Sequence, residues 1–228
     1  MSAAGGWASE HHRGSAGAFH GRDLPDPVER AVWWFEVAAP AVVLGSTQRP
    51  EVVDAAAARA AGVEVARRRS GGGAVWLAPG VATWVDVVLP AGDPAWEDDV
   101  GRAAGWLGRA WVEALGALGV AGAQAHEGPM VRTPHSDLVC FAGLAPGEVT
   151  VDGRKVVGTS QRRTRRGARF QCALLHEWDP APLVDVLAVP GPSRPALVAE
   201  LADVAAGVGA VAPEAVVGAL RAALVDAA

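Results

Sequence analysis

Apolar residues along this chain fall mostly in short runs separated by glycine and proline, which is the pattern of strands in a half-buried sheet. The first two runs are residues 30–36 and 41–44, which are interrupted by Pro40 and ended by Gly45. Further strand-like runs cover residues 63–66, 74–77, 82–89, 138–141, 147–151, 155–158 and 170–175. Asp152-Gly153 lies between two of these runs and predicts a tight hairpin turn.

Helical spacing is clearest after Asp93, an expected N-cap that is followed by Pro94 and three acidic residues. Apolar residues then recur every three or four positions until Gly119, which predicts one buried helix. Shorter helices are predicted over residues 52–61, 195–206 and 213–225. The mixture of hairpins and helices predicts an α/β or α+β fold with a mixed, largely antiparallel sheet.

The expected organisation is a flexible N-terminal tail over residues 1–27, a catalytic domain over 28–190 and a C-terminal helical segment over 191–228 packed on the same domain. Half of the 228 residues are hydrophobic, enough for a sizeable core. The N-terminus lacks the apolar region of a signal peptide, and no apolar stretch is long enough for a membrane span. We therefore expect a cytoplasmic protein without membrane contact.

Charge and metal-ligand spacing exclude several classes of function. A net charge of −5 gives no reason to expect nucleic-acid binding. Cys140 and Cys172 form no disulfide framework, and the six histidines lack the spacing of a zinc site. We therefore expect no metal site and no permanently bound cofactor.

Residues 67–76, Arg-Arg-Arg-Ser-Gly-Gly-Gly-Ala-Val-Trp, carry the first candidate chemistry. Consecutive glycines let backbone amides point at an anion, and the arginines add positive charge beside them. A glycine-rich hairpin with a solvated basic shoulder is the alternative reading. The stretch matches neither of the common nucleotide-binding glycine motifs.

Lys155 is the second candidate, because the other 19 of the 20 basic residues are arginine. Lysine offers a compact ammonium with a tunable pKa, which the planar guanidinium of arginine does not. A lone lysine among arginines thus indicates a position where arginine fails, although chance placement is the competing explanation.

These two blocks together resemble the lipoate–protein ligase and octanoyltransferase family. The resemblance rests on two motifs, Arg-Arg-x-Ser-Gly-Gly-Gly-Ala-Val at 67–75 and Asp-Gly-Arg-Lys-Val-Val-Gly-Thr-Ser-Gln at 152–161. The turn at 44–48 also resembles the first ligand-side loop of that family. The resemblance implies a biotin/lipoate protein ligase-like catalytic fold that attaches lipoyl or octanoyl groups to carrier lysines. The implied partners are free or carrier-bound lipoate or octanoate and a lipoyl-domain or glycine-cleavage H-type carrier protein.

The same resemblance assigns roles to individual residues. It makes Lys155 the cation that binds the acyl carboxyl or an adenylate phosphate, in agreement with the need of acyl transfer for fixed charge beside a developing oxyanion. The implied walls of the substrate or adenylate site are Arg67, Arg68, Ser70, Gly71, Gly72, Gly73, Ala74, Gly158, Ser160 and Gln161.

Ligase and transferase remain open alternatives. A ligase activates free lipoate with ATP and magnesium as co-substrate and uses no nucleophile of its own. A transferase takes octanoyl from a thioester and needs an activated cysteine, and Cys140, fifteen residues before Lys155, resembles the cysteine of one octanoyltransferase branch. Plain strand core is the competing interpretation of Cys140 and the preferred one of Cys172.

Two features depart from the family pattern. The usual His-Asp and Gly-Asn pairs after the glycine loop are replaced by Trp76-Leu77-Ala78-Pro79-Gly80-Val81, which leaves a non-catalytic acyl- or adenylate-binding protein as a third alternative. Residues 191–228 are also too few for the accessory domain of many ligases, which favours a transferase or a ligase whose second part is another chain. Five arginines between 162 and 169 predict a solvated hairpin tip or a docking site for an acidic carrier domain.

Overall fold

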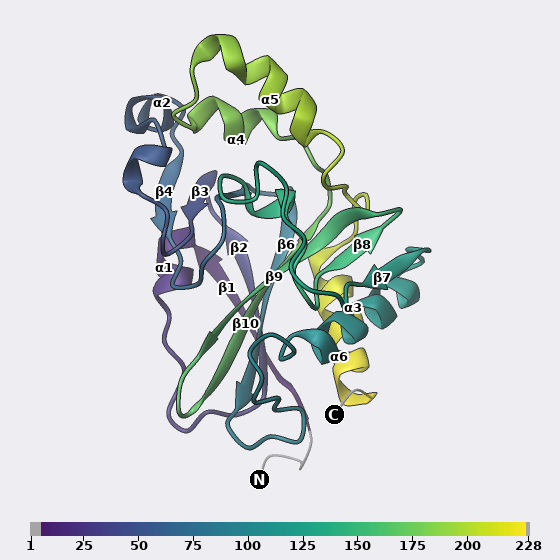
Figure 1. The fold of residues 1–228 in the computed structure, drawn as a ribbon. Helices are drawn as coiled ribbons and strands as arrows, with labels where there is room; N and C mark the ends of the chain where they lie inside the picture. The colour runs from purple at the N-terminus through teal and green to yellow at the C-terminus, as the bar shows by residue number, and fades with distance from the viewer. Residues whose placement is uncertain (1–5, 227–228) are drawn as a thin grey trace.

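The computed structural model of the protein describes residues 6–226, and a seven-stranded sheet forms its centre (Figure 1). Its strand order is β1-β2-β6-β10-β9-β8-β7. The strands are β1 (Ala8–Gly14), β2 (Ala31–Val37), β6 (Ala82–Pro90), β7 (Ala123–Ala125), β8 (Val149–Val151), β9 (Arg154–Arg163) and β10 (Gly167–Leu175). β1 and β2 pair in parallel and all other neighbours are antiparallel, so the expected mixed, largely antiparallel sheet is confirmed.

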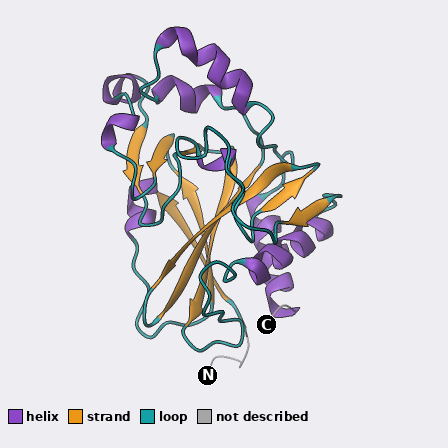
Figure 2. Cartoon of the chain, viewed as in Figure 1, coloured by secondary structure: helices purple, strands orange, loops and turns teal. Residues whose placement is uncertain are grey.

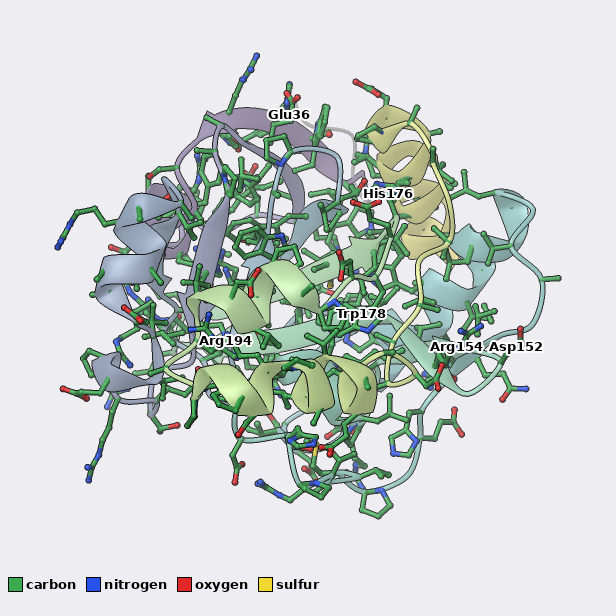
Figure 3. The ribbon with its side chains drawn as sticks, turned by 90° about the horizontal axis from the view of Figure 1, so that it is seen from above. Glu36, Asp152, Arg154, His176, Trp178 and Arg194 are labelled. Atoms are coloured by element: carbon green, nitrogen blue, oxygen red, sulfur yellow. The ribbon has the colours of Figure 1, made fainter. Side chains whose placement is uncertain are left out.

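A second sheet of three strands, in the order β4-β3-β5, lies beside the first. It contains β3 (Ala41–Leu44), β4 (Glu64–Arg67) and β5 (Val75–Leu77). Helices α2 (Ala55–Ala60), α4 (Ala181–Val186) and α5 (Arg194–Leu201) pack beyond it around a common apolar cluster. Figure 3, the view from above, places Trp178 beside these last two helices, and its indole donates to the Leu201 carbonyl at 2.8 Å.

The two faces of the central sheet differ in character because side chains alternate along each strand. Phe170, Cys172 and Leu174 of β10 face the main core, which is covered by α3 (Gly105–Ala117) and α6 (Pro213–Asp226). The intervening Arg169 and Gln171 face the opposite side, toward the small sheet and α1 (Ala16–Gly21). Figure 2 shows most of the helices lying outside the strands of the two sheets.

The hairpin predicted at Asp152-Gly153 is confirmed. It joins β8 to β9, and the φ angles of the two residues are 50° and 75°. Both angles are positive, as the tight turn requires. Figure 3 shows Asp152 at the rim of the molecule, beside Arg154.

The N-terminal region differs from the expected flexible tail: residues 8–14 form β1 and residues 16–21 form α1, while residues 1–5 lie outside the described part. Most side chains of β1 are exposed, so its polar sequence lacks the apolar alternation of a strand. Backbone pairing with β2 and stacking of His11 on Trp34, with ring centroids 3.6 Å apart, hold it instead.

Helix α3 begins at Gly105, twelve residues after the predicted N-cap. Asp93 binds Arg30 at 2.6 Å and accepts the amide of Ala95 at 2.9 Å, forming a turn. Glu97 and Asp99 likewise accept nearby amides, and such local bonds compete with helix formation. None of the described helices combines the length and apolar character needed to cross a membrane.

Candidate active site

The glycine loop connects β4 to β5, and Arg68 fixes its shape from inside. Arg68 is buried, and its guanidinium donates to the carbonyls of Val43, Gly71 and Gly73 at 2.7–3.2 Å. Gly72 has a φ of +93°, a conformation that favours glycine. Arg68 was expected to form part of the wall of the substrate site; it lines a pocket and also holds the glycine loop in place.

The turn at residues 45–48 packs against this loop. Arg67 donates to the carbonyls of Gly45, Ser46 and Gln48 at 2.6–3.2 Å, so it stabilises the turn. The Ser46 amide donates to the Ser70 carbonyl at 2.9 Å. A Cβ on Gly45 would lie 1.9 Å from the Gly72 carbonyl oxygen, so only glycine fits there.

Replacing Gly45 by alanine is therefore expected to displace the glycine loop and lower the free energy of unfolding by about 3 kcal/mol, the upper end of overpacking costs. Gly71→Ala is the matched control, because a Cβ there meets nothing within 4 Å. Urea unfolding of both variants measures the difference. Equal stabilities would contradict the close approach of the two segments.

The loop presents three amides to a cavity. The N–H groups of Gly71, Gly72 and Gly73 have no acceptor among the backbone and side-chain partners of residues 6–226, and all three residues line the cavity. Unpaired amides of consecutive residues beside an arginine are the kind of arrangement that binds a carboxylate or phosphate. This arrangement favours the anion cradle over the solvated hairpin.

The cavity measures about 320 Å³ and is polar around the glycine loop. Its wall also includes Met130, Arg132, Ser136, Cys140, Gly143, Ala145, Glu148, Lys155, Thr159, Ser160 and Gln161. A second, mainly apolar pocket lies between the two sheets and is lined chiefly by Val43, Val75, Leu77, Trp84, Phe141 and Ala173. Cys140, Thr159 and Ser160 line both, so the polar cavity and the apolar pocket meet at these residues.

Lys155 lies in this cavity wall but its side chain is only 3% exposed. Its ammonium donates to the carbonyls of Cys140 at 3.2 Å and Gly143 at 3.1 Å, and it pairs with a Glu148 carboxylate oxygen at 2.7 Å. These three partners match its three N–H donors. Lys155 thus anchors the segment that carries Cys140. The sequence did not predict this anchoring contact.

Glu148 is the functional residue that sequence reasoning missed. Its carboxylate is buried, pairs with Lys155 and accepts the amides of Ala145 at 2.7 Å and Thr159 at 3.1 Å. A buried carboxylate needs such partners, since an isolated buried charge is very costly. A lone acidic residue at the start of an apolar strand, Glu148 before Val149, was the available signal.

Cys140 is not in a strand, contrary to the prediction for residues 138–141. It begins a short 3₁₀ turn, η2 (Cys140–Ala142), and is partly exposed. The strand-like pattern failed because only Val139 pairs, as a single bridge to Ala74, before the chain turns back. The Ala74 carbonyl accepts the Cys140 amide at 2.9 Å, which ties the cysteine to the glycine loop.

The other predicted wall residues come together around the same junction. Ser70 donates to Ser160 across the cavity at 3.0 Å. Gly158 leaves room for Phe141, whose ring would lie 3.1 Å from a Cβ there. Gln161 donates to the Val100 carbonyl at 2.6 Å, and its amide oxygen has no partner among the described residues. Within residues 6–226 no group of three potential ligands is placed to hold a metal ion.

Cys172 faces the core side of β10, as its sequence predicted. Burial raises the pKa of its thiol to about 12, and Thr159 donates to its sulfur at 3.6 Å. We expect iodoacetamide at pH 8 to label Cys140 and leave Cys172 intact, because only about one Cys172 in 10⁴ is then a thiolate. Peptide mass spectrometry of the folded protein measures this, and rapid labelling of Cys172 would contradict the buried position.

A polar pair closes the apolar pocket at its far side. The Gln171 amide donates to His20 Nδ1 at 3.1 Å, so the proton of the neutral imidazole is on Nε2. Burial, and secondarily Arg169 and Arg68, lower the pKa of His20 to about 3, so the ring is uncharged at neutral pH. His20 thus contributes a neutral imidazole to the wall of the apolar pocket, which Arg68 also lines.

Comparison with known folds and families agrees with this geometry. The structure is similar to the bi-partite lipoate protein ligase of Thermoplasma acidophilum, with a TM-score of 0.73 at 19% identity over 97% of this chain and 84% of that one. Lipoate-protein ligase A bound with ATP is similar with a TM-score of 0.70 at 19% identity, over 97% of this chain and 85% of that one. P. falciparum LipL1 in complex with lipoate is similar with a TM-score of 0.66 at 12% identity, over 97% of this chain and 62% of that one. These likenesses define a lipoate-ligase fold.

Residues 22–224 match the lipoyl protein ligase A/B catalytic domain, and the chain belongs to this family. It is therefore an enzyme of protein lipoylation, as the resemblance implied. No curated protein sequence matches the chain.

Proposed function

We propose that this enzyme transfers an octanoyl or lipoyl group from a carrier thioester to a lysine of a lipoyl-type carrier domain, through a thioester on Cys140. The observation that carries this proposal is the position of Cys140. It is partly exposed at the junction of the apolar pocket and the polar cavity, where the carbonyl carbon of a buried acyl chain would lie.

The reaction has two steps that follow from this placement. The Cys140 thiolate attacks the donor carbonyl, the carbon–sulfur bond of the donor breaks, and the carrier leaves as a thiol after taking up the proton that Cys140 released. The neutral amine of the target lysine then attacks the acyl-cysteine. An amide forms, the Cys140–carbonyl bond breaks, and the surplus amine proton returns to the thiolate.

The glycine amides supply the electrostatic part of this mechanism. Negative charge develops on the carbonyl oxygen in both steps, and the unpaired N–H groups of residues 71–73 are fixed donors on the same cavity wall. Lys155 is a positioning residue in this account. It holds the carbonyls of Cys140 and Gly143, and with them the nucleophile, against the cavity.

An ATP-dependent ligase is the second candidate, supported by the same anion cradle. There the lipoate carboxylate attacks the α-phosphate of ATP, pyrophosphate leaves, and the target lysine displaces AMP from the acyl adenylate. Residues 71–73 would hold the adenylate phosphate, magnesium would accompany ATP as co-substrate, and Cys140 would be dispensable. The similar ligase A structure is described as bound with ATP.

Incubation with an apo lipoyl domain separates the candidates. With an octanoyl-carrier thioester, we expect intact-mass analysis to detect one octanoyl group on the enzyme, at Cys140, before it appears on the domain. Product formed only from lipoate and ATP, and unchanged by Cys140→Ser, would sink the thioester mechanism. Binding of acyl groups without turnover from either donor would identify a non-catalytic member.

The acceptor is proposed from the family. A lipoyl domain or a glycine-cleavage H-type carrier protein would present its lysine at the mouth of the cavity. The T. acidophilum structure pairs its ligase with an E2 lipoyl domain. We place the reaction in the reducing cytoplasm, where Cys140 remains a free thiol.

A further inference from the structure

An arginine-lined pocket lies at the tip end of the β9–β10 hairpin, on the strand that also borders the proposed active site. It measures about 110 Å³ and is lined by Arg22, Asp23, Leu24, Arg162, Thr164, Arg166 and Arg169. The arginines there were expected to form a solvated tip or a docking site for an acidic carrier domain; Arg166 is exposed, whereas Arg169 is buried and bound to Asp86. The other arginines that line this pocket are Arg22, Arg162 and Arg166.

The pocket opens on the same face of the sheet as the active site. In the register of the two strands, Ser160 of β9 lies opposite Gln171 of β10, and Arg162 lies opposite Arg169. Ser160 and Arg162 are two residues apart on β9, so their side chains share one face of the strand. Two residues of a strand span about 7 Å. Figure 1 shows β9 running from the site toward the hairpin end, so a ligand leaving the cavity along this strand meets Arg162 next.

The charges around the pocket leave room for one anion. Five guanidinium groups face four carboxylates there. The arginines are Arg22, Arg69, Arg162, Arg166 and Arg169, and the carboxylates are Glu10, Asp23, Asp26 and Asp86. The excess is one positive charge.

Arg162 is the least committed member of this cluster. Its only ionic contact within residues 6–226 is Asp23, 3.7 Å away, and Asp23 is mainly bound to Arg69. The Asp23 side chain is 71% exposed and free to turn toward solvent. Most donors of the Arg162 fork are therefore available to a planar or tetrahedral anion.

We propose that this pocket binds the phosphate of the phosphopantetheine arm of the acyl donor. The inference rests on the proposed function, because a carrier thioester holds its acyl group on such an arm. The acyl chain would occupy the apolar pocket, the thioester would lie at Cys140, and the arm would follow β9 to Arg162. A phosphodiester carries the single negative charge that the cluster lacks.

Paired donors test the proposal. Octanoyl-pantetheine lacks the phosphate, octanoyl-4′-phosphopantetheine carries it alone, and octanoyl carrier protein and octanoyl coenzyme A carry it in the two natural contexts. We expect Arg162→Gln to lower the ratio of kcat/KM for phosphorylated over unphosphorylated donor about tenfold, the loss of one charge-assisted contact. A decrease for the carrier protein alone or for coenzyme A alone identifies the natural source of the phosphate.

Arg163→Gln is the matched control. Arg163 is the next residue on the strand, but it faces the other side and stacks on Trp96, with its guanidinium carbon 4.0 Å from the ring centroid. It should leave the ratio unchanged. An equal loss for both donors in Arg162→Gln would overturn the phosphate assignment and leave only a structural role.

Direct binding separates this inference from the proposed function. Calorimetric titration of the wild-type enzyme with 4′-phosphopantetheine and with pantetheine needs no turnover. Tighter binding of the phosphorylated compound, lost in Arg162→Gln, would uphold the subsite even if no acyl-enzyme forms. Equal affinities for the two compounds would overturn the subsite even if Cys140 is acylated.

Discussion

Cys140→Ser is expected to lower kcat for octanoyl transfer from a carrier thioester by about 10³-fold or more. In the proposed mechanism the thiolate is the attacking group and the leaving group in turn, and a serine hydroxyl lacks both its acidity and its leaving ability. Loss of a nucleophile typically removes the covalent pathway while binding persists. Single-turnover transfer to an apo lipoyl domain, followed by mass, measures the effect.

The matched control is Cys172→Ala, which removes the second thiol from the core side of β10. This variant should still form the acyl-enzyme, because the Cys172 thiol that it lacks has a pKa of about 12 and is protonated in the unmodified enzyme. A hydroxylamine-sensitive adduct that survives Cys140→Ser would contradict the assignment of the nucleophile. Full activity of Cys140→Ser with lipoate and ATP would favour the ligase instead.

Features that depend on neighbouring residues were predictable from the sequence. The Asp152-Gly153 turn follows from two residues that tolerate positive φ, and the strand runs at 41–44 and 82–89 follow from apolar patterning. Composition alone singled out Lys155, because every other basic residue is arginine, and the structure places its side chain in a buried ion pair. In each case the signal lies within a few residues or in a simple count.

Features that depend on contacts between distant parts of the chain were not predictable from the sequence. Strand β1 gains its stability from pairing with β2, more than ten residues away along the chain, and its own side chains are mostly exposed. The turn at Cys140 is set by Ala74 and Lys155, which come from the glycine loop and from β9. Local patterning therefore predicted a strand where long-range contacts impose a 3₁₀ turn.

The departure after the glycine loop has a structural meaning. Leu77 stands in the segment where the family usually has its His-Asp pair, and it is buried in the wall of the apolar pocket. Thus this part of the loop contributes apolar surface to the pocket. The polar groups of the pocket come from other segments, among them His20 and Gln171.

The Lys155–Glu148 pair is expected to control both stability and nucleophile placement. Lys155→Met leaves the Glu148 carboxylate buried with only the amides of Ala145 and Thr159 as partners. Breaking one partner of a buried ion pair costs about 3–5 kcal/mol, so the variant should lose that much unfolding free energy at pH 7.

The double variant Lys155→Met/Glu148→Gln separates stability from catalysis. Removing both charges should recover most of the stability, to within about 1–2 kcal/mol of wild type, because no buried charge remains unpaired. Transfer activity should stay low, since the carbonyls of Cys140 and Gly143 have still lost their anchor. Lys155→Arg tests the geometry alone: it keeps the charge, so lost activity there shows that a compact ammonium is required. Urea unfolding and single-turnover transfer on the same preparations measure both effects. A double variant that regains stability and activity together would show that Lys155 serves the fold and not the placement of Cys140.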